Sequence, residues 1–153
     1  MAESNDYKVL KANLPKGRDR LDRVENVVVN GMPDINYCSE GTECWLEQKS
    51  PKEPKRTTTK LFGSNHKVSQ DQMNWFMRQM KAEGNAYFLI VTDKRWMLIG
   101  GEHADRINDL TVFELLDICL WNTPKPVRDK ESWNKLRTIL NSRQHPTDTN
   151  LSA

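Results

Sequence analysis

The pattern of apolar and polar positions in the first third of the chain predicts one helix followed by strands. Tyr7, Leu10 and Leu14 recur at helical spacing just before a proline, which ends a helix. Further on, β-branched residues and a turn signal at Asn30-Gly31 mark extended segments. The expected elements are a helix over 6–14, a charged loop over 16–23, and strands over 24–29, 32–37 and 43–49.

Two capping boxes mark helix starts in the second half of the chain. Ser69 is followed three residues later by Gln72, and Thr111 by Glu114, the spacing at which a cap and the third helical residue exchange hydrogen bonds. The helix after Thr111 is apolar on nearly every side through residue 121, so it must be covered by the sheet or by another subunit. The expected elements are helices over 70–83, 111–121 and 131–141, and a hairpin with strands over 86–91 and 96–99.

These elements predict an α/β fold in which a mixed central β-sheet is flanked by helices. A chain of 153 residues is long enough for one domain with a real core and too short for two of ordinary size, so we expect a single domain over 1–142. Residues 143–153 are polar and are expected to form a disordered tail. The sequence has no apolar run long enough to cross a bilayer and its start lacks the features of a secretory signal, so we expect a cytoplasmic protein.

Charge and cysteine content narrow the possible functions only slightly. A net charge of +2 neither demands nor excludes nucleic acid. Basic residues nevertheless gather over 50–68, where Glu53 is the single acid, and they are Lys52, Lys55, Arg56, Lys60 and Lys67. With two prolines and three consecutive threonines, this segment is expected to be a mobile basic loop. The three cysteines form no CxxC pair and are expected to be free thiols: Cys38, Cys44 and Cys119.

Candidate chemistry lies on the strand expected over 43–49. Alternate side chains of a strand share one face, so Glu47 and Lys49 are expected to lie side by side. Asp34 ends a Gly-x-Pro-Asp turn 13 residues earlier (47 − 34), and a hairpin of that length can bring the two carboxylates together. Two carboxylates can hold a hard cation that polarises a phosphodiester, while Lys49 orients water or stabilises the phosphate. The trio therefore predicts phosphodiester hydrolysis, although a Glu-x-Lys pair by itself is more often a solvated charged face.

Four segments resemble the PD-(D/E)xK nuclease superfamily, and within it the VRR-NUC and Holliday-junction-resolvase-like proteins of phages. The matched segments are Arg23-Val24-Glu25-Asn26, Gly31-Met32-Pro33-Asp34, Trp45-Leu46-Glu47-Gln48-Lys49 and Ser69-x-x-Gln72-x-x-Trp75. The order and spacing continue through Gly84 and the apolar strand after it, so the resemblance covers roughly residues 20–92. It implies a restriction-endonuclease-like nuclease core and supplies the order of the strands in the sheet.

The resemblance also implies roles for individual residues. Asp34 and Glu47 become metal ligands, Lys49 the catalytic lysine, Glu25 a further acidic ligand, and Gln72 a helper from the following helix. The implied metal is Mg²⁺, with Mn²⁺ as a substitute. Two of these roles have alternatives, because Gln72 can serve the helix cap alone and Glu25 can be one charge in a charged segment.

The implied function is cleavage of branched DNA by a homodimer, as in a Holliday junction resolvase of phage type, inside an infected bacterial host. Next to such a site the basic loop is expected to clamp the DNA backbone through its five cations, rather than to act as a solvated tether. One alternative is a nuclease with the same chemistry that cuts flaps, single strands or ordinary duplex. The other is a DNA-binding module without catalysis.

Aromatic and histidine residues add little to this picture. The tryptophans could stack on unpaired bases, but large aromatic side chains are more often core or interface residues, and we expect that here for Trp75, Trp96, Trp121 and Trp133. His66, His103 and His145 lack the spacing of metal ligands and are expected to have no chemical role.

Overall fold

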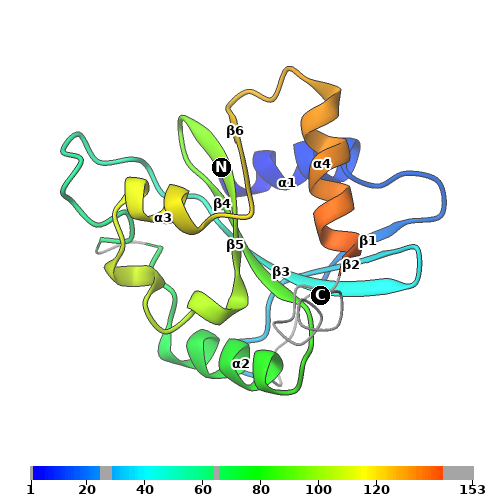
Figure 1. Ribbon diagram of the computed structural model, residues 1–153, viewed down its shortest axis with the longest axis horizontal. Coiled ribbons are helices and arrows are strands. Elements are labelled where there is room, and N and C mark those ends of the chain that lie inside the picture. The colour runs from blue at the N-terminus through cyan, green and yellow to red at the C-terminus, as the bar shows by residue number, and fades with distance from the viewer. Residues whose placement is uncertain (1, 25–28, 64–65, 143–153) are drawn as a thin grey trace, which may run out of the picture.

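The protein is built around a six-stranded sheet with the strand order β1-β2-β3-β4-β5-β6 (Figure 1). The computed structural model describes residues 2–24, 29–63 and 66–142. Strands β3 and β4 run parallel, and the other neighbouring pairs run antiparallel. The elements are α1 (Ala2–Asn13), β1 (Arg20–Arg23), β2 (Ile35–Ser39), β3 (Thr42–Lys49), α2 (Gln70–Lys81), β4 (Ala86–Val91), β5 (Arg95–Gly100), α3 (Val112–Ile118), β6 (Trp121–Pro124) and α4 (Lys130–Asn141), with 3₁₀ turns at Gly101–His103 and Ile107–Asp109.

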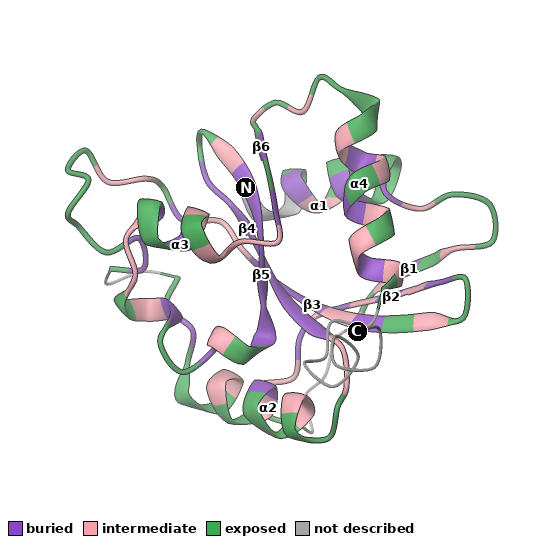
Figure 2. Cartoon of the chain, in the orientation of Figure 1, coloured by how far each residue is buried: buried purple, intermediate pink, exposed green. Residues whose placement is uncertain are grey.

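Helices cover both faces of the sheet, which confirms the predicted α/β class with a mixed sheet. Helices α1 and α4 pack on one face, and α2 and α3 pack on the other. Strand β4 lies in the middle and is buried along its whole length, so it consists of apolar residues without the usual polar alternation (Figure 2). The parallel pair β3 and β4 needs a crossover, and the chain makes it through α2.

Most of the predicted elements are confirmed with small shifts of their ends. Both capping boxes form, with Ser69 and Gln72 at the start of α2 and Thr111 and Glu114 at the start of α3. The strand predicted over 43–49, the hairpin of β4 and β5 and the C-terminal helix are all present. Local signals of this kind work because the residues that make the contact lie within one turn of each other.

The N-terminal part of the sheet differs from the prediction. The expected charged loop over 16–23 contains β1, because Leu21 is buried in the core and its backbone pairs with β2. Charged side chains on both sides of Leu21 suit an edge strand, where they discourage pairing with another chain. The strand expected over 24–29 is wrong at its two ends, Val24 and Val29, and residues 25–28 lie outside the described part of the chain.

The helix expected through residue 121 is also shorter than predicted. It ends at Ile118, and the chain then turns so that the Leu120 amide donates to the Leu98 carbonyl at 2.8 Å and Trp121 begins β6. The open edge of β5 offers backbone partners that a longer helix could not use, and these override the local helical pattern. Val112 and Leu115 are buried in the core, so the sheet covers this helix, while Phe113 is 56% exposed.

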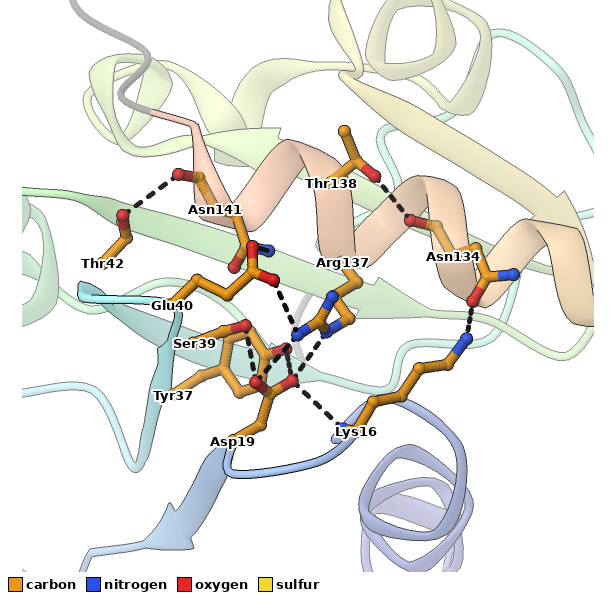
Figure 3. A network of polar contacts seen from close by, with 10 residues as sticks. All are labelled: Lys16, Asp19, Tyr37, Ser39, Glu40, Thr42, Asn134, Arg137, Thr138 and Asn141. Carbon is orange, nitrogen blue, oxygen red and sulfur yellow. Dashed lines mark hydrogen bonds and ion pairs between the residues drawn. The ribbon is translucent and has the colours of Figure 1, made fainter.

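A polar cluster around Asp19 fastens α4 to the N-terminal strands (Figure 3). Arg137 donates to both Asp19 carboxylate oxygens, at 2.8 and 3.0 Å, and the hydroxyls of Tyr37 and Ser39 donate at 2.6 and 2.7 Å. The Lys16 amide donates to the same carboxylate at 3.1 Å. The Arg137 guanidinium and these donors hold the pKa of Asp19 well below its usual range. The cluster therefore keeps a buried charge at neutral pH and fixes α4 against β2.

Three further expectations concern the whole chain. Cys38, Cys44 and Cys119 are free cysteines, as predicted. Within the described ranges, none of the helices is both long and apolar enough to cross a membrane. The tail expected over 143–153 lies outside the residues that the structure describes.

Candidate active site

The pairing of β2 with β3 determines where the two candidate carboxylates lie. Ile35 pairs with Leu46, so continuing the antiparallel register by one residue sets Asp34 opposite Glu47. The pairing of β1 with β2 also continues by one residue, because the Asp34 carbonyl accepts from the Val24 amide at 2.6 Å. Directly opposite residues of an antiparallel pair point to the same face, with Cβ atoms about 4.5–5.5 Å apart. The register thus brings together the two carboxylates that the sequence pattern paired.

Glu47 and Lys49 lie on the face of β3 that α2 covers. Alternate residues Cys44 and Leu46 belong to the core on the opposite face, so the side chains of Glu47 and Lys49 point toward α2. The Lys49 ammonium lies 3.6 Å from a Glu47 carboxylate oxygen, and the two side chains are only 13% and 9% exposed. Burying a charged pair carries a desolvation penalty that an apolar pair would avoid. A solvated charged face, the alternative for Glu-x-Lys, is therefore excluded.

Gln72 links this pair to helix α2. Its side-chain amide donates to Glu47 Oε2 at 3.1 Å, and its side-chain carbonyl accepts from Lys49 Nζ at 3.1 Å. The same side-chain carbonyl accepts from the Ser69 backbone amide at 2.9 Å, while the Gln72 backbone amide donates to Ser69 Oγ at 3.1 Å. Gln72 thus completes the helix cap and contacts both charged side chains of the candidate site, so capping alone does not describe it.

Two neighbours of Asp34 were not singled out from the sequence. Arg23, on β1, places a guanidinium nitrogen 3.8 Å from Asp34 Oδ2. Gly31 has a positive φ of 81°, and a Cβ added there would overlap the Asp71 carbonyl in the first turn of α2. A glycine is therefore needed both for the turn and for the close approach of α2. The sequence signal for Arg23 was its place in a matched segment, and the signals for Gly31 were the Asn-Gly turn and its place in the matched segment that ends at Asp34.

A tryptophan pair continues the contact between β3 and α2 beside the charged residues. Trp45 lies two residues before Glu47 on the same face of β3, and Trp75 lies three residues after Gln72 on α2. The contact between Trp45 and Trp75 therefore lies next to the contact between Glu47 and Gln72. The Trp45 and Trp75 rings meet edge to face with centroids 6.2 Å apart. Both are half-buried, whereas Trp96, Trp121 and Trp133 belong to the core on the other face of the sheet, as expected.

The basic loop over 50–68 is more firmly attached to the domain than its composition predicted. Leu61, Phe62 and Val68 are buried in the core beneath α2 and α3, so the expectation of a mobile segment is wrong for these positions. Lys60 pairs with Asp109 at 3.1 Å. The loop also returns to the site, because the Lys67 carbonyl accepts from Lys49 Nζ at 3.4 Å. Lys52, Lys55, Arg56, Lys60 and Lys67 are all exposed, as a DNA-contacting surface requires.

Glu25, the further acid of the predicted metal site, lies outside the described residues. Among the residues that are described, no group of three or more His, Cys, Asp or Glu side chains could hold a metal ion. The β2–β3 register, continued by one residue, sets the carboxylates of Asp34 and Glu47 on the same face of the sheet.

Comparisons with known proteins find a similar fold among solved structures. No protein-family description matches the sequence, and no curated protein matches it. Among solved structures, the chain is similar to the Holliday junction resolvase Hjc of the archaeal hyperthermophile Archaeoglobus fulgidus. The sequence identity is 18%, the match covers 66% of this chain and 76% of that chain, and the TM-score is 0.44.

Proposed function

We propose that this protein is a metal-dependent DNA endonuclease that hydrolyses phosphodiesters with Asp34, Glu47 and Lys49. The observation that carries the proposal is the burial of a carboxylate and an ammonium beside a second carboxylate on the face of the sheet under α2. A position of this kind in a core is normally apolar, because apolar side chains pack there without a desolvation penalty. A catalytic role for Glu47 and Lys49 would explain why charged side chains occupy this buried position.

The donor set suits a hard divalent cation. Mg²⁺ in phosphate-processing sites is usually bound through one or two carboxylates, with water and substrate completing its octahedron. Glu47 supplies a carboxylate from β3, and Asp34 supplies one from the residue just before β2. Bound there, Mg²⁺ or Mn²⁺ would polarise the phosphodiester and make the water a better nucleophile.

The chain's own residues provide positioning and charge. Lys49 presents an ammonium beside Glu47, where it can orient the attacking water or stabilise the negative charge that develops on the phosphate. Gln72 holds Glu47 and Lys49 from opposite ends of one amide group, which restricts both side chains to one arrangement. Preorganised groups of this kind need no reorganisation during the reaction.

The substrate that we propose is branched DNA, with a four-way junction cut by a homodimer. One such site can nick one strand, so resolving a junction requires two sites related by a twofold axis, which a symmetric dimer supplies. The exposed cations of the basic loop begin three residues after Lys49 and would contact phosphates, which carry little sequence information. Selection by the path of the DNA backbones then dominates over selection by base sequence.

The test is a cleavage assay on a four-way junction and a linear duplex of the same sequence, with and without Mg²⁺. We expect paired, nearly symmetric nicks in the junction, far slower cutting of the duplex, and no cutting without the metal. Equal rates on junction, duplex and single strands would replace the resolvase by a general nuclease with the same residues. Absence of any cutting, together with no metal binding at Asp34 and Glu47, would favour a non-catalytic DNA-binding module.

A further inference from the structure

A cavity of about 300 Å³ lies within the basic loop. The residues around it include Pro51, Lys52, Pro54, Thr59, Lys60 and His66. The described residues that line it include two lysines and no carboxylate. A hollow that is open to solvent on one side and has this lining is suited to an anion.

The single acid of the loop is turned away from this cavity. Glu53 Oε2 accepts from Arg95 Nε at 2.9 Å and from the Thr92 hydroxyl at 2.6 Å, and the Glu53 side chain is only 6% exposed. Its charge is therefore neutralised by the hairpin of β4 and β5. Lys60 does have a partner, Asp109, but both side chains are more than half exposed. An exposed ion pair of this kind is weak, so an incoming anion can compete with Asp109 for Lys60.

Three attachments hold the loop in shape around the cavity. Glu53 fastens its beginning to Arg95. In the middle, the Leu61 amide donates to the Leu110 carbonyl at 3.1 Å. At the end, the Val68 amide donates to the Asn108 side chain at 2.9 Å, and that side chain donates back to the Val68 carbonyl at 2.8 Å. A site that is already formed binds with a smaller loss of conformational entropy.

The cavity lies close to the candidate catalytic residues along both arms of the loop. Lys52 follows Lys49 by three residues, and three extended residues span at most about 11 Å. On the return arm, His66 is next to Lys67, whose carbonyl contacts Lys49. One DNA strand advances by about 3.4 Å along the axis per nucleotide. The cavity is therefore within about three nucleotides of a phosphate held at Lys49.

We propose that this cavity is a preformed site for one backbone phosphate near the bond that is cut. Lys52 and Lys60 supply the charge, and the Thr59 hydroxyl and the His66 imidazole supply further donors. This inference rests on the proposed nuclease function. It divides the basic loop into two parts, because Lys55 and Arg56 are exposed but do not line the cavity.

The division provides a matched control for a binding experiment. Lys52→Gln/Lys60→Gln and Lys55→Gln/Arg56→Gln each remove two positive charges from the same loop. Fluorescence anisotropy with a labelled four-way junction, in a Glu47→Gln background that prevents cleavage, would compare their affinities over a series of salt concentrations. We expect the cavity pair to weaken binding at least tenfold more than the control pair. Equal losses would show that the loop acts only as diffuse charge and would overturn the inference.

A second measurement tests the cavity without DNA. Inorganic phosphate would be titrated into the protein while the His66 imidazole resonances are followed by NMR, assigned through His66→Gln, with His103 as the internal control. We expect a saturable shift at His66 that the cavity pair of substitutions weakens at least tenfold and the control pair preserves. The absence of a saturable shift would overturn the site. A protein that cuts no DNA but shows the His66 response would contradict the nuclease and keep the phosphate site.

Discussion

Replacing Gln72 by methionine separates its two structural roles. The side chain caps α2 through Ser69, and it also contacts Glu47 and Lys49. Methionine is similar in length and favours helix, but it cannot donate to a carboxylate or accept from an ammonium. If the contacts with Glu47 and Lys49 serve catalysis, Gln72→Met lowers the cleavage rate by more than the loss of the cap explains.

The expected size of the effect follows from the kind of hydrogen bond that is lost. A hydrogen bond to a charged group contributes about 1.5–3 kcal/mol. Each 1.36 kcal/mol of transition-state stabilisation corresponds to about a tenfold change in rate, so the loss of one such bond slows cleavage by roughly ten- to hundredfold. Losing the hydrogen bond from the Ser69 backbone amide to the Gln72 side chain lowers the free energy of unfolding by about 1 kcal/mol.

Ser69→Ala is the matched control. It removes the hydroxyl that accepts from the Gln72 amide and weakens the cap by a similar amount, but it leaves the bonds from Gln72 to Glu47 and Lys49 in place. Single-turnover cleavage of a junction and urea denaturation would be measured for both variants. We expect similar losses of stability and a loss of rate only in Gln72→Met. Equal cleavage rates in the two variants would show that Gln72 serves the cap alone.

Four other substitutions test the candidate site and the residues that support it. Asp34→Asn or Glu47→Gln should abolish cleavage and leave junction affinity within a few-fold, because the metal serves the transition state more than the bound ground state; cleavage near the wild-type rate would contradict the assignment. Asp19→Asn should lower the free energy of unfolding by roughly 1.5–3 kcal/mol at pH 7, since it removes the carboxylate charge that accepts hydrogen bonds from Arg137, Tyr37 and Ser39. The pKa of Asp19 is lowered in the folded protein, so its stabilisation is complete above about pH 4 and declines as the pH falls further. Urea denaturation should therefore show wild type and Asp19→Asn converging in acid, and a constant difference would contradict the linkage. Gly31→Asn should lower both Tm and the cleavage rate, because Gly31 also lets α2 approach closely at the Asp71 carbonyl.

The sequence predicted elements whose signals are local and missed those that depend on distant partners. The capping boxes at Ser69 and Thr111 were read correctly, since both partners lie within one turn. Strand β1 was missed because only its pairing with β2 makes a strand of a charged segment around Leu21. Likewise β6 exists because β5 has an open edge, which no local pattern around Trp121 reveals.

The candidate site was predictable to a similar extent. Side-chain alternation placed Glu47 and Lys49 on one face, but nothing in the sequence alone fixed which face or what covered it. Gln72 was found through a resemblance, and its dual contacts appear only when α2 packs across β3. Trp45 was not singled out, because a tryptophan on a strand is ordinary until the opposing Trp75 is seen.

Gly31 shows why a correct local interpretation can still be incomplete. The Asn-Gly pair predicts a turn, and the positive φ of Gly31 agrees with it. An added Cβ would also overlap the Asp71 carbonyl, so the missing side chain lets α2 lie against the segment that leads to Asp34. Asparagine tolerates positive φ but carries a Cβ, so Gly31→Asn preserves the turn and removes the close approach. If Gly31 serves only the turn, Gly31→Asn should cleave and melt like the wild type. If the close approach of α2 to Gly31 matters, the added Cβ displaces α2 and weakens the contact of Gln72 with Glu47. The cleavage rate and the Tm should then both fall.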